Sequence, residues 1–336
     1  MGVTIKDIAK AARVSATTVS NVINGKTSKT TEETKQRILS LVKELDYKPN
    51  AMARSLVNGE TKLIGVILPD ISNAYFSQLV RRIEEAAEEH GYSILVCSTH
   101  NNAENEHKYI NLMREHCVDG MIIGTSSIKE TWQFEELLRM KYPIVAIDRN
   151  ISNFEDVCNV YIDNYNSAYE ATRYFIELGH RNIGCINGTP WSTASRDSVE
   201  GYRQAMKDYG LKLDEGWIYS LSYDVETGIK GAEKLLNYKN KVTAILACSD
   251  TIAYGVYKAA SKLNISIPKD LSVIGLADLM FSEVITPSLT TFSHPLKDMA
   301  KRAIEELITI ISKEPREKTE YVYTAELVIR ESVHGI

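Results

Sequence analysis

From Lys62 onward, short apolar runs alternate with amphipathic stretches, and this alternation constrains the fold more than any other sequence feature. The first series has apolar runs at 63–68, 92–97, 119–123 and 143–147, separated by helical patterns at about 75–90, 103–116 and 130–140. Continuous apolar runs of this length are typical of parallel strands that are buried on both faces. The pattern therefore predicts a doubly wound α/β unit.

A second series repeats this layout. Its predicted elements are a helix at 165–178, a strand at 182–187, helices at 194–209 and 226–237, a strand at 242–247, a helix at 250–263 and a strand at 271–275. An extended stretch at 288–293, a helix at 296–312 and strands near 320–330 follow. We expect two lobes, one comprising 62–161 with 291–318 and the other 162–290 with 319–336.

Residues 1–46 are organised differently, as three short helices. Thr4 with Asp7 and Thr30 with Glu33 predict capping boxes, and Ser15 is placed to cap the second helix. The expected inward residues are Ile5, Ile8, Ala9, Ala12, Val19, Val22, Ile23, Ile38, Leu41, Val42 and Leu45. This spacing predicts a helix-turn-helix, although a plain three-helix bundle with a polar face has the same pattern.

The segment 47–61 predicts a linker with a short helix. Pro49 ends the preceding helical pattern, and Asn50 can cap a new helix over 51–57. Two helical turns are not stable alone in water, so we expect this segment to order only when it binds something.

Residues 1–60 hold ten Lys and Arg against six Asp and Glu, a net charge of +4 that leaves −9 for the remainder. A basic head on an acidic body favours nucleic-acid binding by the head.

Composition argues against several other classes. No apolar run reaches the roughly eighteen residues of a membrane span, and the N-terminus lacks a signal-peptide pattern. We therefore expect a cytoplasmic protein without membrane association. The five scattered cysteines have no metal or redox spacing, and there is no dinucleotide fingerprint, Walker loop or nucleophile elbow. We expect no catalysis, cofactor or metal, and the basic head disfavours a free sugar-binding protein.

Seven motif blocks resemble the lactose/galactose repressor (LacI/GalR) family. They are VTIKDIAKAARVSATTVSNVING (3–25), YKPNAMARSL (47–56), IGVILPDISNAYF (64–76), ELGHRNIG (177–184), SRDSVEGY (195–202), AILACSDTIAYG (244–255) and PSLTT (287–291). The resemblance implies a helix-turn-helix head (1–46), a hinge (47–61) and a two-lobed body of the periplasmic-binding-protein type. It also implies a homodimeric transcription regulator, most commonly a repressor, which binds a palindromic operator in double-stranded DNA and a sugar or sugar derivative as effector. Such a protein would associate with the nucleoid when bound to DNA.

The resemblance assigns DNA contacts to positions in the head and hinge. The expected DNA-binding residues are Thr4, Ser15, Ala16, Thr17, Thr18, Ser20, Asn21, Asn24, Tyr47, Asn50, Ala53, Arg54 and Leu56. The second helix would enter the major groove, and 50–57 would fold in the minor groove, where Leu56 partly unstacks a base step. Alternatively, Leu56 is a core leucine of that short helix. Arg13 occupies a turn position that usually holds Gly or Asn, and Asn21 stands where many members have Arg.

Ligands of such bodies lie between the lobes, at the carboxyl ends of the parallel strands. The expected effector-binding residues are Asn73, Tyr75, Phe76, Asp148, Arg149, Arg196, Tyr223, Ser249 and Asp278. Several of them have a purely structural alternative. Tyr75 and Phe76 could instead pack at the interface between the lobes, and Asp148 and Arg149 could form only a local ion pair. Tyr223 could be an aromatic residue on the surface. Asp250 is interpreted as a helix cap and is not included.

The sequence Gly275-Leu276-Ala277-Asp278 departs from the family's Gly-aromatic-Asp-Asp/Asn. Ala277 lacks the carboxylate that often binds a ligand hydroxyl, which favours an acidic or phosphorylated sugar held by Arg149 and Arg196. We expect the dimer interface at the helices near 75–90 and 226–260. Without a C-terminal leucine heptad, no tetramer is expected.

Overall fold

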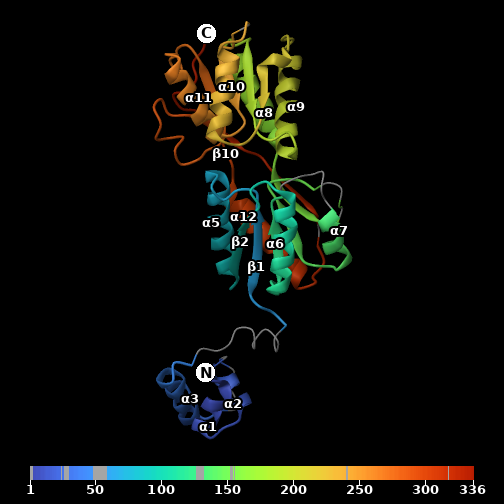
Figure 1. Cartoon of the computed structure of the whole chain (residues 1–336), viewed down its shortest axis with the longest axis vertical. Coiled ribbons are helices and arrows are strands. Elements are labelled where there is room, and N and C mark those ends of the chain that lie inside the picture. The colour runs from blue at the N-terminus through green and yellow to red at the C-terminus, as the bar shows by residue number, and fades with distance from the viewer. Residues whose placement is uncertain are drawn as a thin grey trace. The chain divides into compact units, whose positions relative to one another are not determined.

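The computed structural model describes residues 3–23, 25, 30–47, 59–125, 132–151, 154, 156–239, 241–316 and 318–336. The chain divides into two compact units, 1–61 and 62–336, and the division falls where the first lobe was predicted to begin (Figure 1). The predicted hinge helix at 51–57 lies outside the described residues, as do Asn24, Asn50, Ala53, Arg54 and Leu56.

The first unit contains α1 (Ile5–Ala12), α2 (Ala16–Ile23) and α3 (Glu32–Glu44). Its core consists of Ile8, Ala9, Ala12, Val19, Val22 and Ile38. The predicted starts of α1 and α2 are confirmed, because the Asp7 carboxylate accepts from Thr4 N at 2.9 Å and Ser15 Oγ accepts from Thr18 N at 3.0 Å.

Two predictions for α3 were wrong. Thr31, not Thr30, caps the helix, and its Oγ1 accepts from Thr34 N at 3.4 Å. The shift by one residue brings both Glu32 and Glu33 into the first turn, where negative charge favours the helix dipole. Leu45 is the C-cap and is 37% exposed, so it lies at the helix end rather than in the core.

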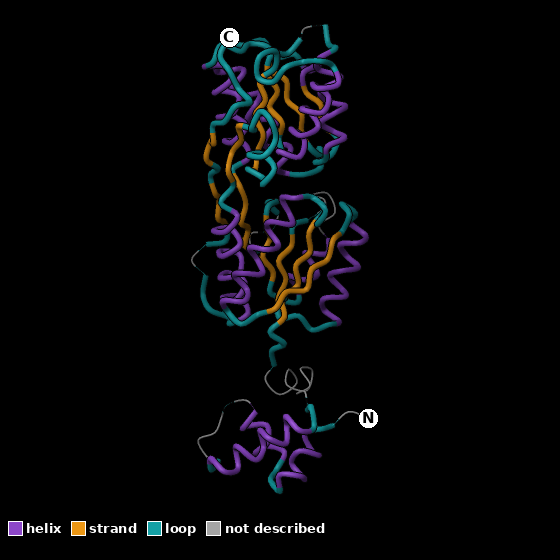
Figure 2. The backbone as a smooth tube through the Cα atoms, turned by 90° about the vertical axis from the view of Figure 1, so that its left-hand side faces the viewer, coloured by secondary structure: helices purple, strands orange, loops and turns teal. Residues whose placement is uncertain are grey.

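The second unit contains two six-stranded sheets (Figures 1 and 2). The first has the parallel order β11-β5-β4-β3-β1-β2, with β1 (Leu63–Leu68), β2 (Ser93–Ser98), β3 (Gly120–Ile123), β4 (Ile144–Ile147), β5 (Cys158–Ile162) and β11 (Glu320–Tyr323). The second has the order β12-β10-β9-β8-β6-β7, with β6 (Ile183–Asn187), β7 (Ile218–Ser220), β8 (Ala244–Ala247), β9 (Ser272–Ala277), β10 (Thr290–Ser293) and β12 (Glu326–Val328). Of the second sheet's strands, β12 is antiparallel to its neighbour β10.

Helices cover both faces of each sheet. In the first lobe, α5 (Ala74–Glu89) and α12 (Leu296–Ile311) pack on one face, and α6 (Ala103–Glu115) and α7 (Trp132–Arg139) on the other. In the second lobe, α8 (Asn164–Glu177) packs against α9 (Thr193–Asp208), and α10 (Val225–Leu236) against α11 (Asp250–Lys262). A short 3-10 helix, η1 (Glu215–Trp217), precedes β7. None of the helices in the described ranges is long and apolar enough to cross a membrane.

The chain passes between the lobes three times, after β5, β10 and β11. The predicted boundary near 161 agrees with the first passage. The boundaries at 291 and 319 were wrong, because β10 pairs with β9 in the second sheet and β11 with β5 in the first. An extended sequence pattern does not indicate which sheet a strand joins. β5 and β7 were not predicted, since both are short and contain polar residues.

Candidate functional site

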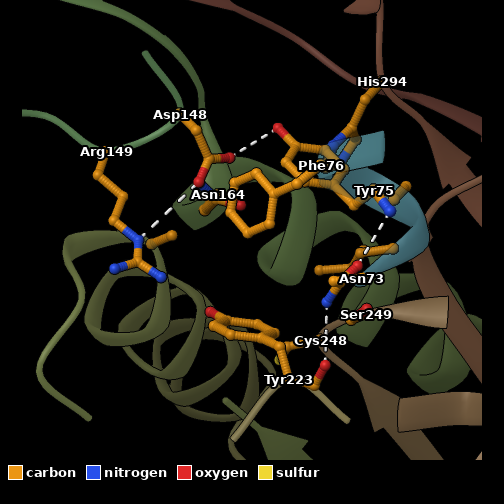
Figure 3. A pocket seen from close by; sticks show the side chains of 13 residues that line it. Asn73, Tyr75, Phe76, Asp148, Arg149, Asn164, Tyr223, Cys248, Ser249 and His294 are labelled. Carbon is orange, nitrogen blue, oxygen red and sulfur yellow. Dashed lines mark hydrogen bonds and ion pairs between the residues drawn. The ribbon is translucent and has the colours of Figure 1, made fainter. Parts of the chain in front are cut away.

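A pocket lies between the two lobes, where the strands of both sheets end (Figure 3). Its lining residues are Asn73, Tyr75, Phe76, Asp148, Arg149, Asn164, Ala194, Tyr223, Cys248, Ser249, Leu276, Ala277 and His294. The empty space, including the part open to solvent, is about 480 Å³.

Asn73 connects the two lobes at this pocket. Its Oδ1 accepts from Tyr75 N at 2.9 Å and so caps α5 in the first lobe. Its Nδ2 donates to the carbonyl oxygen of Tyr223, in the second lobe, at 3.0 Å (Figure 3). One amide side chain therefore both starts a helix and bridges the lobes.

A buried charged pair lies on the first-lobe side. Tyr75 Oη donates to Asp148 Oδ1 at 2.6 Å, and Asp148 Oδ2 lies 4.0 Å from Arg149 Nε. Arg149, 3% exposed, also donates from Nη1 to the carbonyl oxygen of Thr125 at 2.6 Å. Burial raises the pKa of the Asp148 carboxyl, and the Arg149 charge and the Tyr75 hydrogen bond oppose that rise. The local ion pair that the sequence left open as an alternative is present, and it faces the pocket.

Aromatic rings form much of the remaining wall. Phe76 packs edge-on against Tyr75, with ring centroids 5.2 Å apart. Tyr223 comes from the second lobe, and burial raises the pKa of its hydroxyl. Gly188 makes room for this ring, since a Cβ there would lie 2.1 Å from Tyr223 Cε2. Tyr223 is therefore a wall of the pocket rather than a surface aromatic.

The second helix of the head presents a short polar face. Thr17 and Asn21 are exposed on it, whereas Val19 and Val22 are buried beneath. Arg13, in the turn between α1 and this helix, has φ 55°, the left-handed conformation for which Gly or Asn is usual at this position. Short polar side chains on an exposed helix are able to approach base edges in a major groove.

Both units match models of one protein family. Residues 4–50 match "Bacterial regulatory proteins, lacI family", and residues 61–331 match "Periplasmic binding proteins and sugar binding domain of LacI family". The chain belongs to the LacI family. It is a DNA-binding transcriptional regulator and not an enzyme.

Relatives and solved structures agree with this assignment. The chain is 36% identical over 334 residues to the HTH-type transcriptional regulator DegA of Bacillus subtilis (strain 168). The aligned region covers 99% of this chain and 98% of that protein. Its fold is similar to that of the lac repressor dimer bound to operator and the anti-inducer ONPF, with a TM-score of 0.87 over the full length of both chains at 22% identity. It is also similar to a periplasmic binding protein/LacI transcriptional regulator from Alkaliphilus metalliredigens QYMF complexed with D-xylulofuranose, with a TM-score of 0.72 and 28% identity over 81% of this chain and 99% of that one.

The structure brings seven of the nine predicted effector residues of this LacI-family regulator to the pocket: Asn73, Tyr75, Phe76, Asp148, Arg149, Tyr223 and Ser249. It does not place Arg196 or Asp278 among the lining residues. The Arg196 side chain is 59% exposed, with Nε 3.5 Å from Asp197 Oδ1. The Asp278 carboxylate is paired with Arg330 Nη2 at 2.8 Å. The Asp278 carboxylate is therefore held by an ion pair away from the pocket, whereas the Arg196 side chain lies largely in solvent.

Asp250 is not the helix cap that the sequence indicated. Ser249 caps α11, with its Oγ accepting from Thr251 N at 3.2 Å. The Asp250 carboxylate is fully buried and accepts from Leu279 N, Ser282 Oγ and Thr291 Oγ1 at 2.7, 2.6 and 2.5 Å. It ties the start of α11 to the segment that follows β9 and to β10 itself.

Six lining residues were not among the predicted effector-binding residues: Asn164, Ala194, Cys248, Leu276, Ala277 and His294. The sequence had singled out Ala277 only as a position without the family's carboxylate. Asn164 follows β5, which was not predicted as a strand. His294 directly follows β10, and the predicted extended stretch at 288–293 was a signal that could have found it.

The predicted DNA-binding residues of the head differ in exposure. Thr4, Ser15, Thr17 and Asn21 are exposed, and Ala16, Thr18, Ser20 and Tyr47 are half-buried. Ala16 and Tyr47 pack against the core of the head, so part of their surface is not available to DNA. Ser15 and Thr18 are hydrogen-bonded to each other at the helix start, Oγ to Oγ1, at 2.9 Å.

Proposed function

We propose that this protein is a homodimeric repressor that reads a palindromic operator and is controlled by a hydroxylated small molecule bound between its lobes. The observation that carries the proposal is that one pocket is lined by both lobes and crossed by the Asn73–Tyr223 hydrogen bond. A ligand there contacts both lobes, so its binding free energy depends on the angle between them.

The chemistry of the pocket favours a sugar or sugar derivative. The rings of Phe76 and Tyr223 suit the C–H faces of a sugar, and amide, carboxylate and guanidinium groups suit its hydroxyls. The bound D-xylulofuranose of the similar Alkaliphilus protein supports this class. An acidic or phosphorylated sugar loses support, because Arg196 does not line the pocket and Arg149 is already paired with Asp148.

The proposed DNA surface is α2 with the residues around its start. Thr17 and Asn21 would read base edges, and Ser15 and Thr18 would contact phosphates. The segment 51–57 and the residues Asn24, Asn50, Ala53, Arg54 and Leu56 complete the proposed contacts, outside the described residues. Because the protein binds DNA, we further propose that it is cytoplasmic and, when bound to its operator, associated with the nucleoid.

Dimerisation is proposed because a single helix-turn-helix buries too little surface for tight, specific binding. The proposed interface comprises α5 of the first lobe and the α10–α11 side of the second. Beside α11, the apolar side chains of Met280, Phe281 and Val284 are 66%, 49% and 72% exposed. A cluster of exposed apolar side chains of this kind supports an interface there. A ligand that changes the lobe angle would change the spacing of the two 51–57 segments at the dimer axis, and so DNA affinity.

Selection from random DNA with the full-length protein, followed by mobility shifts on the enriched fragment, tests this proposal. We expect a palindromic site, one dimer per site, and affinity that falls steeply with salt. Adding an effector should either release the DNA or tighten binding, which identifies induction or corepression. Enrichment of a single asymmetric half-site bound by one chain, or no enrichment, would contradict the proposal.

A further inference from the structure

His294 lines the pocket with two ring nitrogens that have no hydrogen-bond partner among the described residues. Both Nδ1 and Nε2 are buried. Buried polar atoms are nearly always hydrogen-bonded, because an unpaired one has lost its water without compensation. In a pocket wall, such atoms indicate a partner that is not part of the chain.

The position of the ring is fixed by the backbone and by packing. His294 follows Ser293, the last residue of β10, which pairs with Ala277 of β9. The carbonyl oxygen of His294 accepts from Leu296 N at 2.8 Å. The imidazole packs edge-on against Tyr75, with centroids 5.8 Å apart and an interplanar angle of 88° (Figure 3). The Tyr75 hydroxyl donates to Asp148. Aromatic packing therefore holds the ring, and neither of its nitrogens is committed to a hydrogen-bond partner among the described residues.

The imidazole is uncharged at neutral pH. Burial lowers the pKa of His294 to about 4, and the nearby Asp278 carboxylate opposes this shift. That carboxylate is itself neutralised by Arg330 at 2.8 Å. A neutral imidazole has one nitrogen that donates and one that accepts, and a hydroxyl group can pair with either.

The rest of the pocket wall has no net charge either. The charged side chains among its lining residues are Asp148 and Arg149, which are adjacent and of opposite sign. With His294 neutral, a phosphate or carboxylate on the ligand would be buried without a countercharge, which is unfavourable. Beside His294, Ala277 has only a methyl group and leaves space for the ligand.

We infer that His294 is a specificity-determining residue that binds hydroxyl groups of the effector through both ring nitrogens and selects uncharged sugars over sugar phosphates and sugar acids. The inference rests on the proposed function for the location of the effector site. It does not depend on the operator or on the dimer.

The test compares the full-length protein with His294→Gln, His294→Leu and the control His90→Gln, an exposed residue at the end of α5. Thermal shift with D-xylulose, D-fructose, D-glucose, cellobiose, D-glucose 6-phosphate and D-glucuronate identifies ligands, and calorimetry gives their Kd values. We expect the uncharged sugars to include the strongest ligand. His294→Leu should weaken it at least about tenfold, as expected for lost hydrogen bonds. His294→Gln, which keeps a donor and an acceptor, should stay within a few-fold of wild type.

Several outcomes would overturn the inference. The first is that D-glucose 6-phosphate or D-glucuronate stabilises the protein more than every uncharged sugar. The second is that no uncharged sugar binds, and the third is that His294→Leu binds the sugar with the affinity of the wild type. A large fall in the melting temperature of ligand-free His294→Leu would also contradict it, because the ring has no hydrogen bonds to the protein to lose. Operator binding by the same proteins is measured separately, so failure of the proposed regulator function is distinguishable from failure of this inference.

Discussion

Asn73 donates a hydrogen bond from one lobe to the Tyr223 carbonyl oxygen of the other, at 3.0 Å, while its own oxygen caps α5. Asn73→Asp keeps the capping oxygen and removes the donor. We expect the affinity for a pocket-binding sugar to fall about fivefold, since a hydrogen bond contributes roughly 1 kcal/mol. Isothermal calorimetry measures the change.

Asn102→Asp is the matched control for this variant. Asn102 caps α6 in the same way, with Oδ1 accepting from Asn105 N at 3.0 Å, but it does not line the pocket. It should leave sugar affinity unchanged. Equal losses in both variants would mean that added negative charge, and not the bond between the lobes, controls affinity.

A second prediction concerns Asp250, whose buried carboxylate accepts three hydrogen bonds, two from the segment after β9 and one from β10. Asp250→Ala leaves a buried backbone N–H and two hydroxyls without their acceptor. We expect the free energy of unfolding to fall by about 3 kcal/mol, the range found when a buried polar network is broken. Urea unfolding of the full chain, followed by circular dichroism, measures it.

The control for Asp250→Ala is Asp270→Ala. Asp270 is exposed and its carboxylate accepts from Ser266 N at 2.9 Å, so only a local turn is affected. Its expected loss of stability is below about 1 kcal/mol. Comparable losses in the two variants would show that the Asp250 network contributes nothing beyond an ordinary turn.

Much of the fold and of the pocket could be predicted because parallel sheets place the ends of their strands together. Asn73 and Ser249, which lie 176 positions apart in the sequence, follow different strands and line the same pocket. The apolar runs that form β1, β3 and β4 indicated strands because strands buried on both faces are continuously apolar, whereas β2, at the edge of the sheet, is only half-buried. Strand ends therefore located the site before any side-chain geometry was known.

The direction of individual side chains could not be predicted. Asp278 also follows a strand, but it turns toward Arg330, which is 52 positions further along the chain. Pairing between such distant charges is a property of the folded chain and leaves no local signal. The same holds for β5, which is recognisable as a strand only once β4 and β11 flank it.

A third prediction follows from the buried, neutral imidazole of His294. Its pKa is lowered to about 4 in the folded protein, whereas an unfolded histidine titrates near 6.5. As the pH falls below 6.5, the unfolded chain takes up a proton that the folded chain does not, so stability is lost. At pH 5 this group should contribute a loss of about 2 kcal/mol relative to pH 7.

His294→Gln removes this titration and isolates it from other groups. Asp250 acts in the opposite direction, because burial raises its pKa to about 6 and folding is favoured as the carboxyl becomes protonated. Both proteins retain Asp250, so its contribution cancels in the difference. Urea unfolding at pH 7 and pH 5 should show a smaller acid-induced loss in the variant. Equal losses would mean that His294 titrates normally in the folded state.

A fourth prediction concerns the turn of the head, where Arg13 has φ 55°. A left-handed conformation is unfavourable for a residue with a Cβ by about 1 kcal/mol, and glycine adopts it without that strain. Arg13→Gly should therefore raise the local stability of the head by roughly 0.5–1 kcal/mol, while Lys10→Gly, inside α1, should lower it by about 1 kcal/mol. Amide hydrogen exchange of the buried residues Ile8 and Val19 in the full chain reports both changes. Faster exchange in Arg13→Gly would show that the arginine side chain stabilises the turn by more free energy than the left-handed backbone conformation costs.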